Sequence, residues 1–235
     1  MPTCATCGSE VLGDARFCSQ CGAKLGDPTS AIDPSIRDRV LTTLRAEHRL
    51  CTVVFADMTA SVRRTRDLDA EGATALVNPL LETMVELMVH HGGRIDRFLG
   101  DGVLAVFGVP TAHEDDPIRA VRAAVELRER AADLGLEVTV GVNTGRVYSG
   151  PVGSSLHEEL TVMGPVVNLA ARLQGAAGAG EVIIGSATRE HVHAAFELRS
   201  RSLDIKGMDD PVPAFSVERL ARNPDKVRGI EGLSA

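Results

Sequence analysis

The sequence of 235 residues has few aromatic side chains: it contains no tryptophan, one tyrosine (Tyr148) and six phenylalanines. Hydrophobic residues still make up 44% of the chain, so we expect a folded protein with an aliphatic core. The formal net charge is −7, and no run of basic residues is interleaved with aromatic residues. Nucleic-acid binding needs such a basic surface, so nucleic acid is not an expected partner.

Long apolar runs are absent as well. No stretch approaches the roughly 20 consecutive apolar residues that a membrane-spanning helix needs. The first ten residues, MPTCATCGSE, lack the basic and apolar regions of a secretory signal. We therefore expect a soluble, cytoplasmic protein with no membrane partner.

Cysteine is rare, but four of the five cysteines form two Cys-x-x-Cys pairs separated by ten residues. Two such pairs can bring four thiolates to one tetrahedral Zn²⁺, and a site that uses all four positions is structural rather than catalytic. Two disulfides are the alternative, which the missing secretion signal disfavours. We expect one structural Zn²⁺ in a zinc ribbon over residues 1–26, bound by Cys4, Cys7, Cys18 and Cys21.

The pattern along the chain divides the rest of the sequence into three parts. Residues 27–48 contain a Gly/Pro/Ser linker followed by helical spacing in SIRDRVLTTLRAEHRL, residues 49–220 form the main domain, and residues 221–235 are a polar tail or linker. In the main domain, strands are expected at 50–56, 94–99, 103–107, 136–145, 159–164, 181–185 and near 202–207. Helices are expected at 70–93, 113–135 and 165–173, with a short one after 185. This alternation predicts an α/β (α+β) fold in which helices cover a sheet.

Two acidic residues follow or interrupt the expected strands. Asp101 lies in a Gly-Asp-Gly turn between two apolar runs, a pattern typical of a β-hairpin, and a turn alone would explain it. Asp57 ends the buried run LCTVVFA. If the hairpin pairs beside that strand, both carboxylates reach one edge of the sheet and can bind one or two divalent cations.

A polar pair lies on the expected helix 165–173. Asn168 and Arg172 are four residues apart and therefore share one face of a helix that otherwise consists mostly of Val, Leu and Ala. Arginine can bind phosphate with a fork of hydrogen bonds, and asparagine can hold a hydroxyl or ring oxygen. The alternative is a solvated arginine beside a turn asparagine.

Three segments in this order resemble the catalytic domain of class III nucleotidyl cyclases of the bacterial type. VVFADMTAS resembles the first metal motif of the family, RFLGDGVLAVFG the second, and TVMGPVVNLAARL the transition-state segment. The ordered resemblance covers about residues 49–220 and is far more specific than any single motif. It implies a ferredoxin-like cyclase homology domain.

The resemblance implies an adenylate cyclase that converts ATP to 3′,5′-cyclic AMP and pyrophosphate at the interface of a homodimer. Each site would use two Mg²⁺ or Mn²⁺ ions, one activating the ribose 3′-hydroxyl and one holding the triphosphate. The metal acids would come from one protomer and the Asn/Arg pair from the other. The implied residues are Asp57, Asp101 and the Met58 carbonyl for the metals, Asn168 and Arg172 for catalysis, Arg97 and Thr161 for the base, and Thr59, Ala60, Ser61 and Lys206 for the phosphates.

Departures from the family pattern leave other functions open. Arg97 replaces the usual base-reading lysine, and Ala60 and Val62 replace a glycine and a threonine of the phosphate loop. Thr161 fits ATP, and the Glu/Cys pairing usual for guanylyl cyclases is absent. The alternatives are a guanylate cyclase, a catalytically silent cyclase-like module for dimerisation or nucleotide sensing, and a protein whose zinc ribbon recruits a protein partner.

Overall fold

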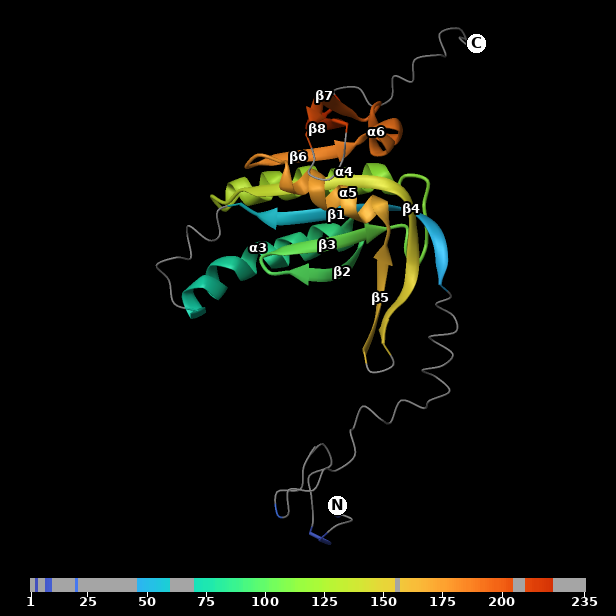
Figure 1. Cartoon of the computed structure of the whole chain (residues 1–235). Coiled ribbons are helices and arrows are strands. Elements are labelled where there is room, and N and C mark those ends of the chain that lie inside the picture. The colour runs from blue at the N-terminus through green and yellow to red at the C-terminus, as the bar shows by residue number, and fades with distance from the viewer. Residues whose placement is uncertain are drawn as a thin grey trace, which may run out of the picture. The chain divides into compact units, whose positions relative to one another are not determined.

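The computed structural model describes residues 3, 7–9, 20, 46–59, 70–154, 157–204 and 210–221 (Figure 1). The chain divides into two compact units, Met1–Arg45 and Ala46–Ala235. Every helix that the structure describes, and nearly all of the described residues, belong to the second unit. Among the described residues, no helix is both long and apolar enough to cross a membrane.

The described strands of the second unit form one sheet in the order β2-β3-β1-β4-β6-β8-β7, with β5 paired to β4. The central strand β1 (Glu47–Met58) is antiparallel to β3 (Gly102–Phe107) on one side and to β4 (Val138–Ser154) on the other. The outer strands are β2 (Arg94–Leu99), β5 (His157–Met163), β6 (Glu181–Gly185), β7 (Phe196–Leu203) and β8 (Val212–Leu220).

The connections give the sheet a split β-α-β arrangement. Strand β1 leads through α3 (Ala70–His90) to β2, and β3 lies between these two strands. In the same way, β3 leads through α4 (Asp116–Asp133) to β4, and β1 lies between them. This is the ferredoxin-like topology, and it confirms the predicted fold class.

The two faces of the sheet pack against different helices, because alternate residues of a strand point to opposite faces. On β1, Val54 and Ala56 belong to the large core under α3 and α4, whereas Cys51 and Val53 belong to a smaller core. That smaller core includes Ala170 of α5 (Pro165–Gly175), which lies on the opposite side of the sheet from α3 and α4 (Figure 1). The short helix α6 (Ser186–Val192) follows β6.

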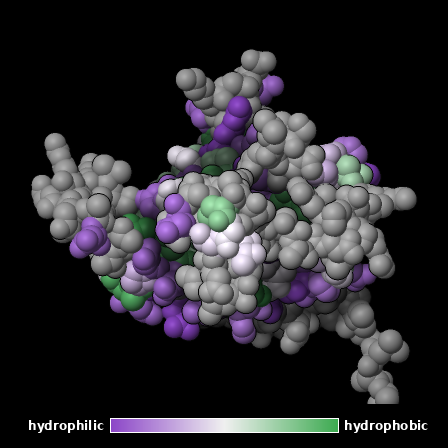
Figure 2. Space-filling model, turned by 90° about the horizontal axis from the view of Figure 1, so that it is seen from below, coloured by the Kyte–Doolittle hydropathy of each residue, from purple (hydrophilic) through white to green (hydrophobic). Residues whose placement is uncertain are grey.

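Few large apolar side chains are exposed among the described residues. The face shown in Figure 2 carries hydrophobic residues in small patches between hydrophilic ones. The exposed large apolar residues are Leu50, Val89, Phe98, Leu99, Leu134, Met163 and Leu220.

The structure corrects the predicted elements at three places. Residues 47–49, which the expected helical pattern includes, belong to β1. Strand β4 continues to Ser154, nine residues beyond its expected end at 145. The last expected strand, near 202–207, overlaps the end of β7 at residues 202 and 203, and its residues 205–207 lie outside the described part of the chain. Strand β8 was not predicted, because Pro211 and Pro213 interrupt the strand pattern.

Candidate active site

The register of β1 and β3 brings the two predicted metal acids together. Asp57, near the end of β1, is paired with Gly102, the first residue of β3, so Asp101 in the preceding turn lies beside it. A Cβ atom at position 102 would lie 2.5 Å from the carbonyl oxygen of Ala56 and 2.8 Å from Oδ1 of Asp57. Glycine is therefore required where the hairpin packs against the Asp57 carboxyl.

The electrostatics of this pair are unfavourable when both acids are ionised. Burial, the charge of Asp101 and a hydrogen bond between the two carboxyls together raise the pKa of Asp57 to about 6, against the opposing effect of a backbone hydrogen bond from Met58. Oδ1 of Asp57 is buried and accepts no hydrogen bond from any described residue. Two adjacent carboxyls with an unsatisfied buried oxygen form a suitable site for a cation.

The segment after β1 is fixed to the neighbouring strand region. Met58 is buried, and the backbone N–H of Thr59 donates to the carbonyl of Glu137 at 2.8 Å. Because this N–H already has a partner, it is not available to phosphate as the sequence analysis expected. The hydroxyl of Thr59, in contrast, is buried and has no hydrogen-bond partner among the described residues. Ala60 and Ser61 lie outside the described residues.

Helix α5 carries Asn168 and Arg172 on its exposed face. Its Ala170 and Leu173 are buried against the sheet, and Gly141 of β4 allows the close approach, because a Cβ there would collide with the α5 backbone. Asn168 and Arg172 are both exposed. In the described part of the chain, no hydrogen bond or ion pair connects either side chain to Asp57 or Asp101.

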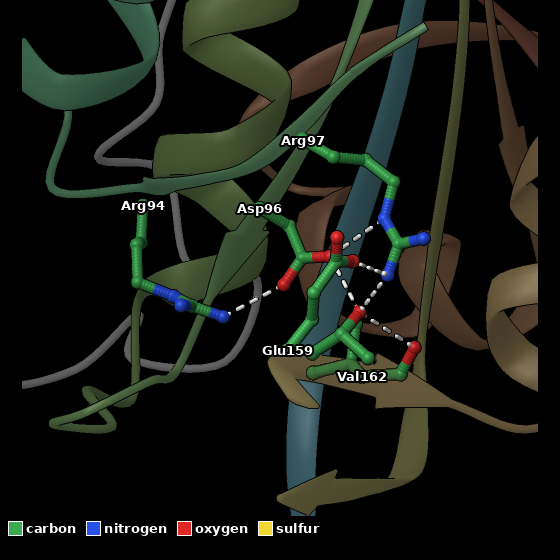
Figure 3. Close-up of polar contacts among 6 residues, drawn as sticks. Arg94, Asp96, Arg97, Glu159 and Val162 are labelled. Carbon is green, nitrogen blue, oxygen red and sulfur yellow. Dashed lines mark hydrogen bonds and ion pairs between the residues drawn. The ribbon is translucent and has the colours of Figure 1, made fainter. Parts of the chain in front are cut away.

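The two predicted base-reading residues contact each other. Nη2 of Arg97, on β2, donates to Oγ1 of Thr161, on β5, at 2.5 Å. Thr161 in turn donates to Oδ2 of Asp96 at 2.6 Å, and Nε of Arg97 donates to the same oxygen at 3.3 Å. Figure 3 shows Arg94 and Arg97 approaching the Asp96 carboxylate from two sides, with Glu159 nearby.

Asp96 is the polar residue of this region that the sequence analysis missed. Its side chain is fully buried, and its Oδ1 accepts a hydrogen bond from Nη2 of Arg94 at 2.7 Å. The segment Arg94-Ile-Asp-Arg97 does contain a signal, since an acid lies between two arginines in an expected strand. That pattern alone also fits a solvated charged surface, so only the approach of β5 identifies the cluster.

The other predicted site residues are covered only in part. Cys7 is exposed, with its Sγ 3.3 Å from Oγ of Ser9. Cys4, Cys18, Cys21 and Lys206 lie outside the described residues. Cys51 is buried in the core, and burial raises the pKa of its thiol to about 11. Within the described ranges, no group of three or more His, Cys, Asp or Glu side chains could hold a metal ion.

Three features are typical of a nucleotidyl cyclase catalytic domain: the ferredoxin-like sheet, the carboxyl pair where β1 ends and β3 begins, and the Asn/Arg face of α5. The chain belongs to this family: the model of the adenylate and guanylate cyclase catalytic domain matches residues 45–217. A zinc-ribbon domain model matches residues 3–25. Both matches confirm the resemblance that the motifs indicated.

Similar proteins include cyclases with different substrates. The adenylyl cyclase CyaB from P. aeruginosa is 30% identical, with a TM-score of 0.73 over 76% of this chain and 98% of that one. The guanylyl cyclase Cya2 is 31% identical, with a TM-score of 0.69 over 75% of this chain and 95% of that one. An uncharacterised protein of Mycobacterium bovis is 30% identical over 83% of this chain, which spans only 36% of the relative's length.

Proposed function

We propose that the chain is an adenylate cyclase that forms 3′,5′-cyclic AMP and pyrophosphate from ATP. The observation that carries the proposal is the carboxyl pair Asp57 and Asp101, with its unsatisfied buried oxygen, where β1 ends and β3 begins in a cyclase-family sheet. The pair has the chemistry of a cation site, and the family supplies the reaction class.

The carboxyl pair fits a hard divalent cation. Mg²⁺ and Mn²⁺ prefer oxygen ligands, and Mg²⁺ in particular uses one or two carboxylates together with substrate phosphates. In this proposal Asp57, Asp101 and the carbonyl oxygen of Met58 hold two such ions. When bound, the ions supply positive charge that lowers the pKa of the ribose 3′-hydroxyl and neutralises the triphosphate.

The chain's own residues bind and orient the substrate around that centre. The hydroxyl of Thr59, which has no partner among the described residues, would donate to a phosphate oxygen. Ala60 and Ser61 would contribute backbone N–H groups, and Lys206 a positive charge. The ribose 3′-oxygen attacks the α-phosphorus in line, and pyrophosphate leaves.

Asn168 and Arg172 would complete the site from a second protomer. Both lie exposed on α5 and have no contact with the carboxyl pair of their own chain. Across a two-fold axis, Arg172 would stabilise negative charge at the α-phosphorus and Asn168 would orient the ribose. Exposed apolar residues on the base-reading strands, Phe98 and Leu99 on β2 and Met163 on β5, support an interface there.

The choice of ATP rests on Arg97 and Thr161. Their direct contact puts a guanidinium and a hydroxyl next to each other on neighbouring elements, and Arg97 keeps an exposed part of its side chain for the base. The guanidinium can address acceptors of either purine, so Thr161 is the discriminating group.

The zinc ribbon has a separate role in this proposal. Cys4, Cys7, Cys18 and Cys21 would bind one structural Zn²⁺, and the ribbon would recruit a protein partner or regulate the enzyme. We place the enzyme in the cytoplasm, where its substrate ATP is available.

The test is a product assay with purified protein and Mn²⁺, using ATP and GTP in separate reactions. Cyclic AMP and pyrophosphate should appear together, and Asp101→Asn in the same preparation should form neither. Cyclic GMP as the main product would assign a guanylate cyclase. No cyclic product from either nucleotide would refute the enzyme and favour the silent module.

A further inference from the structure

A buried carboxylate on β2 has no place in the chemistry described so far. The side chain of Asp96 is fully buried, and its hydrogen bonds within the described residues go neither to the metal acids nor to α5. Its two oxygens accept hydrogen bonds from Arg94, Arg97 and Thr161. Its charge is balanced by two guanidinium groups, and two of its three partners are the base-reading residues.

The backbone of β2 is built to make this arrangement possible. The pairing of β2 with β3 shifts register between Ile95 and Arg97, which leaves Asp96 out of the regular ladder. In a regular strand, Asp96 and Arg97 would point to opposite faces. At a bulge a side chain is redirected, and here both residues reach the hydroxyl of Thr161.

These contacts fix the direction of every hydrogen bond at Thr161. A hydroxyl has one proton to donate and two lone pairs that accept. The proton goes to Oδ2 of Asp96 at 2.6 Å, and the second oxygen within 3.5 Å, the Val162 carbonyl, can also only accept. One lone pair accepts from Nη2 of Arg97. Thr161 is itself buried, and one lone pair remains, so toward a base that packs against this residue the hydroxyl is an acceptor only.

An acceptor at this point distinguishes the two purines. Adenine carries an amine at position 6, which donates, whereas guanine carries a carbonyl oxygen there, which accepts. A hydroxyl that can only accept pairs with the adenine amine. Toward guanine, its lone pair faces a lone pair of the carbonyl oxygen, and no proton lies between the two oxygens. A threonine free to rotate would donate to guanine just as well as it accepts from adenine.

We propose that Asp96 is a positioning residue that sets the nucleotide specificity: it takes the Thr161 proton, holds Arg97 beside it, and thereby makes the site select a 6-amino purine. This inference rests on the proposed function and names what determines its substrate. Asp96 itself touches no substrate and acts through Thr161 and Arg97.

The test compares wild type with Asp96→Asn in the full chain. The amide has the same shape but can turn its NH₂ toward Thr161, which frees the hydroxyl proton to donate to guanine. We expect the ratio of kcat/KM for ATP to that for GTP to fall about tenfold, the factor that corresponds to one hydrogen bond of about 1.4 kcal/mol. A merely structural role would lower both values and leave their ratio unchanged.

Three further variants guard against a folding defect and against a general effect of removing charge. Thr161→Ser keeps the hydroxyl and should keep the ratio, whereas Thr161→Val removes it and should lose the preference. Glu218→Gln is the matched control, because Glu218 also accepts a guanidinium hydrogen bond, from Arg199 at 2.8 Å, but on β7 and β8. It should leave the ratio within about twofold, well below the factor for one hydrogen bond.

A binding measurement separates this inference from the proposed reaction. 3′-DeoxyATP and 3′-deoxyGTP lack the attacking hydroxyl, so competition between them reports base selection without turnover. Tighter binding of 3′-deoxyATP that Asp96→Asn abolishes would support the inference even if wild type formed no cyclic product. An unchanged ratio in Asp96→Asn and Thr161→Val, a wild-type preference for the guanine nucleotide, or no binding of either would overturn it.

Discussion

Replacing Asp57 by asparagine should stabilise the metal-free protein at neutral pH while abolishing activity. In the folded state the pKa of Asp57 rises from its ordinary value of 3.8 to about 6, because the carboxyl is buried next to Asp101. This difference corresponds to about 3 kcal/mol of unfolding free energy, and since the side chain is partly exposed we expect about 1–2 kcal/mol. Asparagine has the same shape and no charge, so it avoids that cost.

The dependence on pH has a definite sign. Below pH 3.8 Asp57 is protonated in both states and costs nothing, and as pH rises toward 6 the unfolded state loses its proton first. The cost is complete above about pH 7. The advantage of Asp57→Asn should therefore be largest near pH 7.5 and shrink steadily between pH 7 and pH 4.

Thermal unfolding with EDTA and with Mn²⁺ measures this effect. For a domain of this size, 1–2 kcal/mol corresponds to a rise in Tm of about 2–8 °C in EDTA at pH 7.5. Mn²⁺ should raise the Tm of wild type and not that of Asp57→Asn, because the variant lacks a ligand. The control is Asp204→Asn, at an exposed position. A Tm at or below that of wild type in EDTA, or equal stabilisation by Mn²⁺, would refute the reasoning.

Three further changes test other parts of the account. Arg172→Ala should lower kcat about 100-fold, the usual cost of one charge-stabilising donor. Its thermal unfolding should stay unchanged, because the side chain is exposed. A change in KM alone would contradict the role of Arg172. Gly102→Ala should lower both stability and Mn²⁺ affinity, since its Cβ would lie 2.8 Å from Oδ1 of Asp57; a variant with wild-type Tm and Mn²⁺ affinity would contradict the packing. Deleting residues 1–30 should remove about one zinc ion per chain, as measured by metal analysis, and leave cyclase activity intact. Zinc retained by the shortened chain would contradict this prediction.

Much of the fold was predictable because the patterns that specify it are local. The apolar run before Asp57, the Gly-Asp-Gly turn at Asp101 and the helical spacing around Asn168 each predict an element that the structure contains. Strand β8 was missed because Pro211 and Pro213 weaken its pattern, and only its place between β6 and β7 makes it a strand.

The polar cluster around Asp96 could not be predicted, because it depends on contacts between distant segments. An acid between two arginines on an outer strand is an ordinary solvated pattern. Its burial follows from a register shift in β2 and from the approach of Thr161, which is 65 residues further along the chain. The sequence predicts the contact between Asp57 and Asp101 only if the hairpin pairs with the first strand. That antiparallel register is a tertiary property, and the structure supplies it.

The shared active site is the central claim, and mixing two impaired variants tests it most directly. Asp57→Ala should be inactive and Arg172→Ala should keep only about one hundredth of the wild-type activity, since every site in either homodimer lacks one component. In an equal mixture with random exchange, half of the dimers are mixed and each holds one intact site, so activity should return to about one quarter of the wild-type value. Recovery to that level supports a site built from two protomers, and a mixture that stays inactive despite confirmed subunit exchange contradicts it.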